Sequence, residues 1–545
     1  MSRLKKLLSV VCAVLFVFSA VSCGVTDEND DGGESVIASY IRCNDDGTET
    51  FMVGDKPFLY LGAESRFEAY VNCDRSTYDD YEKYVKTASD LGFNVLAVSV
   101  DWADIETEKG SYDFTVINKI LGFGYKYDIK IELLWYSALM CGDSHQWHLP
   151  EYVFTETPRY EMYIGGVKKD VIENSTIYGE RTFLRIDDKT FMERETNVVK
   201  ALMGHIYEWE KARDFPKVLI GVQVYNEVDA FPEKRLDDYN VGIDGVKQTK
   251  DQVWRTICTA MSNCAKAFKS SPYKVITRTN LLRPQCADLT SSGFSPIERA
   301  VQLYETEYLD AVGYDPYFNN LSDLKKSIEF YQEKLPKNFT HIAENGRTGT
   351  TGEGSYVNGD GELLLAVSMN CGYILYELAS PKTFDKGGYS QGIVTPDTLE
   401  DYSYTDKIRK MSKALRSVGP VAGAVNPENF AVFNADSSTG RENWNKTVNT
   451  TSVAFNFLTN KGAKGFAIVF DGYAYVYASE EATITLSNGV FGDAEKGYFS
   501  DGRWVTEESK ALSDEKLSLN GDGTYRIRIV SSDGALVSNA NLYKG

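Results

Sequence analysis

Short apolar runs alternate with longer amphipathic stretches between about residues 57 and 380. The runs are rich in β-branched residues, as buried parallel strands are, and the stretches between them have the length of crossover helices. The eight predicted strands are residues 58–62, 95–100, 129–134, 218–224, 275–279, 311–314, 341–343 and 372–376. Eight such strands, each followed by a helix, predict an α/β fold, a (β/α)8 TIM barrel with long inserted loops.

After about residue 425 the apolar positions recur with a period of two, and Asp-Gly pairs typical of hairpin turns separate the runs. The predicted strands there are 467–470, 473–478, 482–486 and 525–530, with another near residue 536. We therefore expect a barrel domain at 37–424 and a smaller antiparallel β-sandwich at 425–545. The sandwich is either a carbohydrate-binding module or a packing partner of the barrel.

The N-terminus has the pattern of a secretory signal. Basic residues precede an apolar stretch, 7–21, which is too short for a membrane-spanning helix. The segment ends Ala20-Val21-Ser22-Cys23, which resembles a bacterial lipobox. We expect residues 1–22 to be removed and Cys23 to carry a lipid; the alternative is an ordinary cleavage site with an incidental cysteine.

Residues 23–36 are acidic and rich in glycine, and they predict a flexible tether that does not fold. Acidic runs in this place resemble the surface-export signal of Bacteroidetes lipoproteins, although a plain solvated linker would look the same. We therefore expect an exported lipoprotein of the outer membrane, held by its lipid anchor at the cell surface or on the periplasmic face.

The charge and the cysteine content of the chain limit the classes of partner and ligand that we expect. Lys and Arg total 58 against 78 Asp and Glu, a net charge of −20, which argues against nucleic acid because its binding relies on basic residues. Seven cysteines remain beyond Cys23 and Cys12, and their odd number and wide spacing predict no disulfide framework. His145 and His148 lack further ligands at zinc-like spacing. We expect no metal and no cofactor, and the sequence leaves the oligomeric state open.

Acidic residues follow two of the predicted barrel strands, where the reacting groups of such barrels lie. The fourth strand ends in Asn226-Glu227 and the seventh in Glu344. Hydrolysis of a glycosidic bond needs one carboxyl group to protonate the leaving oxygen and another to attack the anomeric carbon. Glu227 alone could be a surface acid, and Glu344 alone could cap the loop 346–361. Together they predict a catalytic pair.

A third stretch lies after the second strand, where Trp102, Glu106, Gly110 and 112–114 fall in the register of glycoside hydrolase clan A. Thr107 stands where the clan often has proline. Within the clan the chain most resembles the family 35 and family 42 β-galactosidases. The matching stretches are Gly62-Ala-Glu64, Leu133-Leu-Trp135 and 149–153. The usual His-Tyr of strand one is absent, and strand eight lacks the frequent tryptophan.

The resemblance implies retaining hydrolysis with Glu227 as the acid/base and Glu344 as the nucleophile. One carboxyl group must then hold a proton while the other is ionised. The same resemblance implies that Asn226 binds the 2-hydroxyl group of the sugar.

Three further residues are implied to bind substrate. Tyr314, at the end of strand six, matches an aromatic residue that donates a hydrogen bond to the nucleophile, unless it packs inside the barrel. Glu64 and Trp135, at the ends of strands one and three, fit hydroxyl-binding and stacking roles, or else structural ones.

The leading hypothesis is an exo-acting β-galactosidase that removes β-linked sugars from the side chains of polysaccharides or oligosaccharides. An endo-acting glycanase of the same clan, of galactanase or mannanase type, is the enzymatic alternative. A non-catalytic surface glycan-binding lipoprotein is the alternative from another class. The long insert at 137–182 and the loop 346–361 could wall off one end of a cleft, which favours exo action.

Overall fold

The computed structural model divides the chain into two compact units, Met1–Val36 and Ile37–Gly545. The structure describes residues 35–45, 47–66, 80–175, 179–236, 240–283, 286, 295–317, 320–346, 358–379, 392–395, 398–434, 442–448, 453–459, 462–487, 489–510, 512 and 516–531. The predicted signal peptide and Cys23 lie outside these residues. Within them, no helix is both long enough and apolar enough to cross a membrane.

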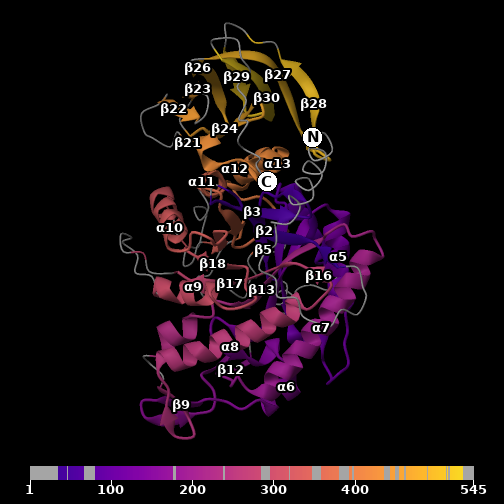
Figure 1. Ribbon diagram of the computed structural model, residues 1–545, viewed down its shortest axis with the longest axis vertical. Helices are drawn as coiled ribbons and strands as arrows, with labels where there is room; N and C mark the ends of the chain where they lie inside the picture. The colour runs from indigo at the N-terminus through magenta and orange to yellow at the C-terminus, as the bar shows by residue number, and fades with distance from the viewer. Residues whose placement is uncertain are drawn as a thin grey trace, which may run out of the picture. The chain divides into compact units, whose positions relative to one another are not determined.

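Eight parallel strands close into a barrel, which confirms the predicted fold class (Figure 1). In chain order they are β5 (Leu61–Ser65), β6 (Val95–Asp101), β7 (Lys130–Met140), β13 (Leu219–Asn226), β17 (Ile276–Leu282), β18 (Ala311–Asp315), β19 (His341–Asn345) and β20 (Gly372–Leu375). Each strand pairs with its neighbour in the sequence order, and β20 pairs with β5 to close the ring.

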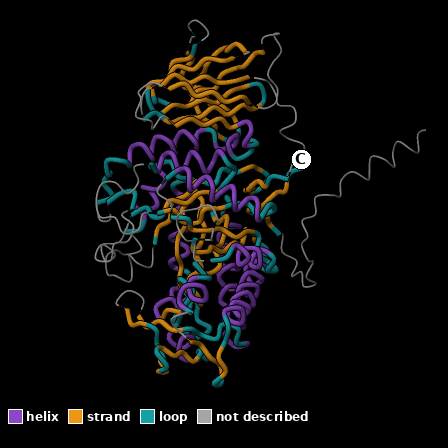
Figure 2. Tube along the Cα trace, turned by 90° about the vertical axis from the view of Figure 1, so that its left-hand side faces the viewer, coloured by secondary structure: helices purple, strands orange, loops and turns teal. Residues whose placement is uncertain are grey.

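Helices follow the strands and cover the outside of the barrel (Figures 1 and 2). They are α3 (Glu82–Asp90), α4 (Trp102–Ile105), α5 (Thr115–Lys126), α7 (Lys189–Lys211), α8 (Lys250–Lys269), α9 (Ile297–Tyr304), α10 (Leu321–Lys334), α11 (Gly359–Ser368) and α12 (Thr405–Ser417). The longest of these, α7, is capped by Asp188, whose side chain accepts hydrogen bonds from the backbone amides of Thr190 and Phe191. Helix α8 begins with a capping box of Thr249 and Gln252.

Most strands run further than the apolar runs that predicted them. β13 continues to Asn226, β18 to Asp315 and β19 to Asn345, all polar residues. A neighbouring parallel strand satisfies the backbone of these positions whatever the side chain, so hydropathy alone ends the strands too early. The first strand, predicted at 58–62, lies at Leu61–Ser65.

A buried ion pair occupies the interior of the barrel. Arg278 of β17 donates to both carboxylate oxygens of Glu132 of β7, at 2.5 and 2.7 Å, and both side chains are 2% exposed. The hydroxyl of Tyr60 donates to the same carboxylate at 2.5 Å, and Arg278 also donates to Gln223. These contacts satisfy two charges that burial would otherwise make costly.

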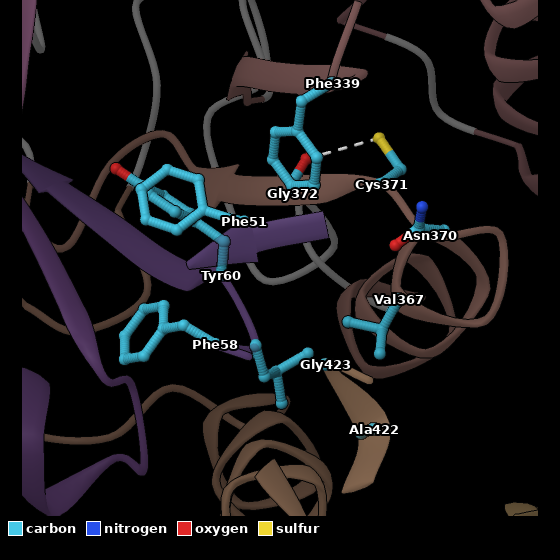
Figure 3. Close-up of a pocket in the computed structure, with 11 residues that line it drawn as sticks. Phe51, Phe58, Tyr60, Phe339, Val367, Asn370, Cys371, Gly372, Ala422 and Gly423 are labelled. Atoms are coloured by element: carbon cyan, nitrogen blue, oxygen red, sulfur yellow. Dashed lines mark hydrogen bonds between the residues drawn. The ribbon is translucent and has the colours of Figure 1, made fainter. Parts of the chain in front are cut away.

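An N-terminal hairpin closes the end of the barrel at which the strands begin. It consists of β2 (Ser39–Cys43) and β3 (Glu49–Val53), and the Phe51 ring lies 5.6 Å from that of Phe339. Figure 3 shows a pocket between Phe51, Phe339 and Cys371. Its volume of about 10 Å³ holds at most one water molecule, so it offers no room for a sugar.

The C-terminal region is built from two antiparallel sheets, as predicted (Figure 2). Six strands form one sheet, in the order β21 (Phe430–Asn434), β24 (Lys464–Phe470), β25 (Tyr473–Ala478), β30 (Thr524–Ser531), β27 (Gly489–Ser500), β28 (Arg503–Lys510). The other four form the second sheet, in the order β22 (Glu442–Val448), β23 (Val453–Thr459), β26 (Glu481–Ser487), β29 (Leu517–Asn520). The strand predicted near residue 536 lies outside the described residues.

The two sheets enclose one apolar core, which includes Phe433 and Ile527 of the first sheet and Phe457 and Ile484 of the second. Lys464 of β24 forms a buried ion pair with Asp360 of α11 at 2.9 Å. This contact ties the sandwich to the barrel.

We predict that Arg278→Met destabilises the protein by about 3–5 kcal/mol, because it leaves the carboxylate of Glu132 buried without its partner. The double variant with Glu132→Gln should recover part of the loss. Thermal unfolding measures both effects. As a control, Arg409→Met breaks the exposed ion pair with Asp401 and should cost less than about 1 kcal/mol. A stability of Arg278→Met equal to that of the control would contradict this interpretation.

Candidate active site

The end of strand β13 presents Asn226 and Glu227 at the mouth of the barrel. The backbone turns sharply there, since Tyr225 and Glu227 have positive φ angles of 62° and 43°. Such conformations are rare for residues other than glycine and are found preferentially at functional sites. Glu227 is 8% exposed, so its carboxyl group borders the mouth without being freely solvated.

The end of strand β19 presents Glu344 from another part of the same mouth. Tyr317, two residues beyond β18, donates a hydrogen bond from its hydroxyl group to Oε2 of Glu344. Burial and the neighbouring carboxyl groups of Glu344, Glu227 and Asp315 raise the pKa of Tyr317 well above its ordinary value. The hydroxyl group therefore stays protonated and remains a donor.

Three carboxyl groups meet in the mouth. One oxygen each of Glu227, Asp315 and Glu344 lies within 4.8 Å of the other two. Burial raises the pKa of Asp315 well above its ordinary value, and the charges of Glu344, Glu227 and Glu64 raise it further. Among the described residues, these three carboxyl groups are the acidic, histidine or cysteine side chains that lie close enough together to bind one metal ion. Carboxylates this close repel one another, which favours a bound proton on at least one of the three groups.

Amide side chains form a hydrogen-bond network next to these three carboxyl groups. Nδ2 of Asn280 on β17 donates to Oδ2 of Asp315 at 2.7 Å and to Oδ1 of Asn226 at 3.0 Å. Oδ1 of Asn280 accepts the backbone N–H of Glu227 at 3.0 Å. Gln223 donates a second hydrogen bond to Oδ1 of Asn226, at 3.0 Å. One asparagine therefore fixes the ends of strands four and six relative to each other.

The expectation that Tyr314 donates to the nucleophile is wrong. Its hydroxyl group lies 3.0 Å from Oγ of Ser327 on α10, and its ring stacks on Tyr331 at 4.3 Å. Successive side chains of a strand point to opposite faces, so Tyr314 faces the outer helices and Asp315 faces the barrel interior. Tyr317 makes the contact that was expected of Tyr314.

The expectation that Trp135 stacks on a sugar is also wrong. Its indole N–H donates to Glu195 of α7 at 3.3 Å, and its ring meets Phe268 of α8 edge to face at 6.1 Å. Trp135 is 1% exposed and packs between the barrel and its outer helices. Glu64, by contrast, lies near the end of β5, is 1% exposed, and its negative charge raises the pKa of Asp315. Its role as a hydroxyl-binding group stays a prediction.

The insert after β7 and the loop after β13 share one small sheet on the mouth side of the barrel. In it, β9 (Glu161–Ile164) pairs antiparallel with β14 (Asn240–Ile243). The two histidines of the insert each face a carboxylate: His145 lies 2.5 Å from Asp143, and His148 lies 2.7 Å from Asp101. These pairs hold the insert in place, and burial lowers the pKa of His145 to about 4.

Asp315, Tyr317 and Asn280 are the site residues that the sequence did not single out. The segment Asp315-Pro316-Tyr317 directly follows the apolar run of strand six, in the position that already identified Glu227 and Glu344. Alternation along the strand would have turned Asp315 inward once Tyr314 was placed outward. Asn280 had no such signal, because the predicted strand ended at Thr279.

Comparisons with known proteins give limited matches. A family model described as a domain of unknown function (DUF4978) matches residues 256–439, less than half of the chain. That segment contains Asp315 and Glu344 but not Glu227. No curated protein matches this chain.

Two solved structures of glycoside hydrolases match over 68% of this chain. One is an exo-β-1,4-mannosidase from Opitutaceae bacterium strain TAV5, with 14% identity and a TM-score of 0.43. The other is a polyextremophilic β-galactosidase from the Antarctic haloarchaeon Halorubrum lacusprofundi, with 13% identity and a TM-score of 0.45. The match spans 61% and 58% of those chains, less than two thirds of either.

Proposed function

We propose that this protein is a retaining β-glycoside hydrolase in which Glu344 is the nucleophile and Glu227 is the acid/base. The observation that carries the proposal is the position of the two carboxyl groups, on strands four and seven, with oxygens within 4.8 Å of each other. Retaining enzymes hold their two carboxyl groups about 5–5.5 Å apart, whereas inverting enzymes leave about 6.5–9.5 Å for a water molecule.

In the proposed first step, Glu344 attacks the anomeric carbon while Glu227 gives its proton to the leaving oxygen. In the second step, Glu227 takes a proton from water, which displaces Glu344 from the sugar. The hydrogen bond from Tyr317 suits both steps, because it stabilises Glu344 as a carboxylate before attack and again as it departs. Asn226 adds a donor for the 2-hydroxyl group: its oxygen already accepts two hydrogen bonds, whereas among the described residues the hydrogen bond that its nitrogen donates goes to the sulfur of Met140, at 3.6 Å.

The finer proposal is exo action on β-galactosides at the ends of oligosaccharide or polysaccharide side chains. The support for exo action is the small sheet that joins the loops after β7 and β13, because it adds walls on the mouth side of the barrel. The choice of galactose rests on the likeness of the short sequence stretches to family 35. An assay of product size on a galactan separates exo from endo cleavage.

This activity is proposed to act at the outer membrane. The support is the lipobox-like sequence that ends in Cys23 and the acidic residues behind it. A lipid on Cys23 would hold the enzyme close to the substrate that enters the cell.

Glu344→Gln is expected to reduce hydrolysis of aryl β-glycosides to background, because an amide cannot form the glycosyl-enzyme bond. Glu227→Gln should reduce kcat/KM by about 100- to 10,000-fold, least for substrates whose leaving group needs no proton. Azide should restore activity to Glu227→Gln and yield a glycosyl azide. Thermal unfolding near that of the parent is the control. Turnover by Glu344→Gln at the parental rate would exclude it as the nucleophile.

Tyr317→Phe is expected to lower kcat/KM by about tenfold to a hundredfold, the contribution of a hydrogen bond to a charged group. The hydrogen bond from Tyr317 favours the ionised form of Glu344. Without this bond ionisation is less favourable, so the acidic limb of the kcat/KM profile moves to higher pH. The matched control is Tyr314→Phe, which removes a hydroxyl group on the outer face of the barrel. An equal shift of the limb in both variants would contradict the role of Tyr317.

Cys23→Ala is expected to move the protein from the membrane fraction to the soluble periplasmic fraction, since the acceptor of the lipid is lost. Cys12→Ala, inside the segment that is removed, is the control and should leave the protein in the membrane. Fractionation followed by immunoblotting measures both. Retention of Cys23→Ala in the membrane after an alkaline wash would contradict the anchor.

A further inference from the structure

Asp315 has no assigned task in the two-carboxylate reaction, yet it lies between the two proposed catalytic residues. It is 0% exposed, and one of its oxygens belongs to the group of three within 4.8 Å. Its Oδ2 accepts the hydrogen bond from Asn280 at 2.7 Å. Its Oδ1 is fully buried and has no hydrogen-bond partner among the described residues.

The charged groups around Asp315 do not favour a carboxylate there. Glu344 on β19, Glu227 on β13 and Glu64 on β5 act on it with negative charge, and Arg278 on β17 acts with positive charge. Arg278 is already paired with Glu132 in the layer below, so its charge is largely offset. A buried carboxylate with an unpaired oxygen beside like charges is strongly disfavoured, and the group takes up a proton instead.

A protonated Asp315 needs an acceptor for its O–H group. Oδ2 already accepts from Asn280, and Oδ1 is buried without a partner among the described residues, so Oδ1 is the oxygen that can carry the proton. Glu227 holds a proton itself in the resting state of the proposed reaction, whereas Glu344 is ionised. An ionised carboxylate is the stronger acceptor, so the proton of Asp315 points to Glu344.

We propose, on the basis of the proposed function, that Asp315 is a positioning residue that stays protonated and donates a hydrogen bond to the carboxylate of Glu344. Glu344 then accepts hydrogen bonds from both Asp315 and Tyr317, which belong to the segment that ends strand six. The resting site carries two protons and one negative charge over its three carboxyl groups. The second donor holds Glu344 ionised for attack and stabilises it again when it leaves the sugar.

The test compares two substitutions at this position. Asp315→Leu removes the donor, so we expect the acidic limb of the kcat/KM profile to move to higher pH and kcat to fall by about tenfold to a hundredfold. Release of Glu344 in the second step should slow most, so a burst of the aryl leaving group should precede steady turnover. Asp315→Asn keeps an N–H donor in place of the O–H group, and it should restore much of the activity and move the limb back toward the parental position.

Two measurements separate this role from a structural one. Tyr314→Phe, on the outer face of the same strand, should leave both the limb and the burst as in the parent. Infrared spectroscopy of the unliganded protein at neutral pH should show the C=O stretch of a protonated carboxylic acid, and the band should weaken in Asp315→Asn. The spectrum needs no catalytic activity, so it tests Asp315 even where a variant is inactive.

Three outcomes would overturn the proposal. The first is an Asp315→Leu variant whose acidic limb stays in place. The second is an Asp315→Asn variant whose limbs both move to lower pH, since that shift means a negative charge was lost. The third is a spectrum in which Asp315→Asn removes carboxylate absorption instead of the acid band. If the parent protein hydrolyses no aryl β-glycoside, the proposed function fails, while the infrared result still decides the state of Asp315.

Discussion

Parallel pairing of eight strands in a closed ring is the constraint on which the candidate site depends. Because all the strands run in one direction, their carboxyl ends meet at one rim, and residues far apart in the sequence become neighbours. Glu227, Asp315 and Glu344 come from three different strands and share one small space for this reason. Backbone hydrogen bonds, which do not depend on the side chains they carry, impose this arrangement.

The same constraint creates an electrostatic problem at the mouth. Three carboxyl groups lie within 4.8 Å of one another, and the arginine beneath them is already paired with Glu132. Neutral side chains donate hydrogen bonds to these carboxyl groups: Asn280 donates to Asp315, and Tyr317 donates to Glu344. Protons can offset the remaining charge, because carboxyl groups this close to one another disfavour full ionisation.

Most of the strands could be predicted from the sequence, because the hydrophobic periodicity that indicates them is local. All eight barrel strands lie at or close to the predicted runs, and the change to period two at about residue 425 marked the antiparallel sheets. Glu227 and Glu344, which were chosen because they follow strands, do lie close together at one rim, while their catalytic roles stay a proposal. The predictions for Tyr314 and Trp135 were wrong because, although both residues lie on the expected strands, their side chains face the outer helices.

The facing of a strand residue is what local sequence leaves undetermined. Barrel strands are buried on both faces, so inward-facing and outward-facing residues are both largely apolar. The hydrophobic pattern therefore does not show which residues of a strand face the barrel interior. Only closure of the barrel decided that Asp315 points inward, that Tyr314 packs on Tyr331 and that Glu132 meets Arg278. The sequence by itself therefore determined the number of barrel strands and their approximate positions along the chain. Tertiary structure decided which of those residues share the mouth, because that depends on contacts between strands far apart along the chain.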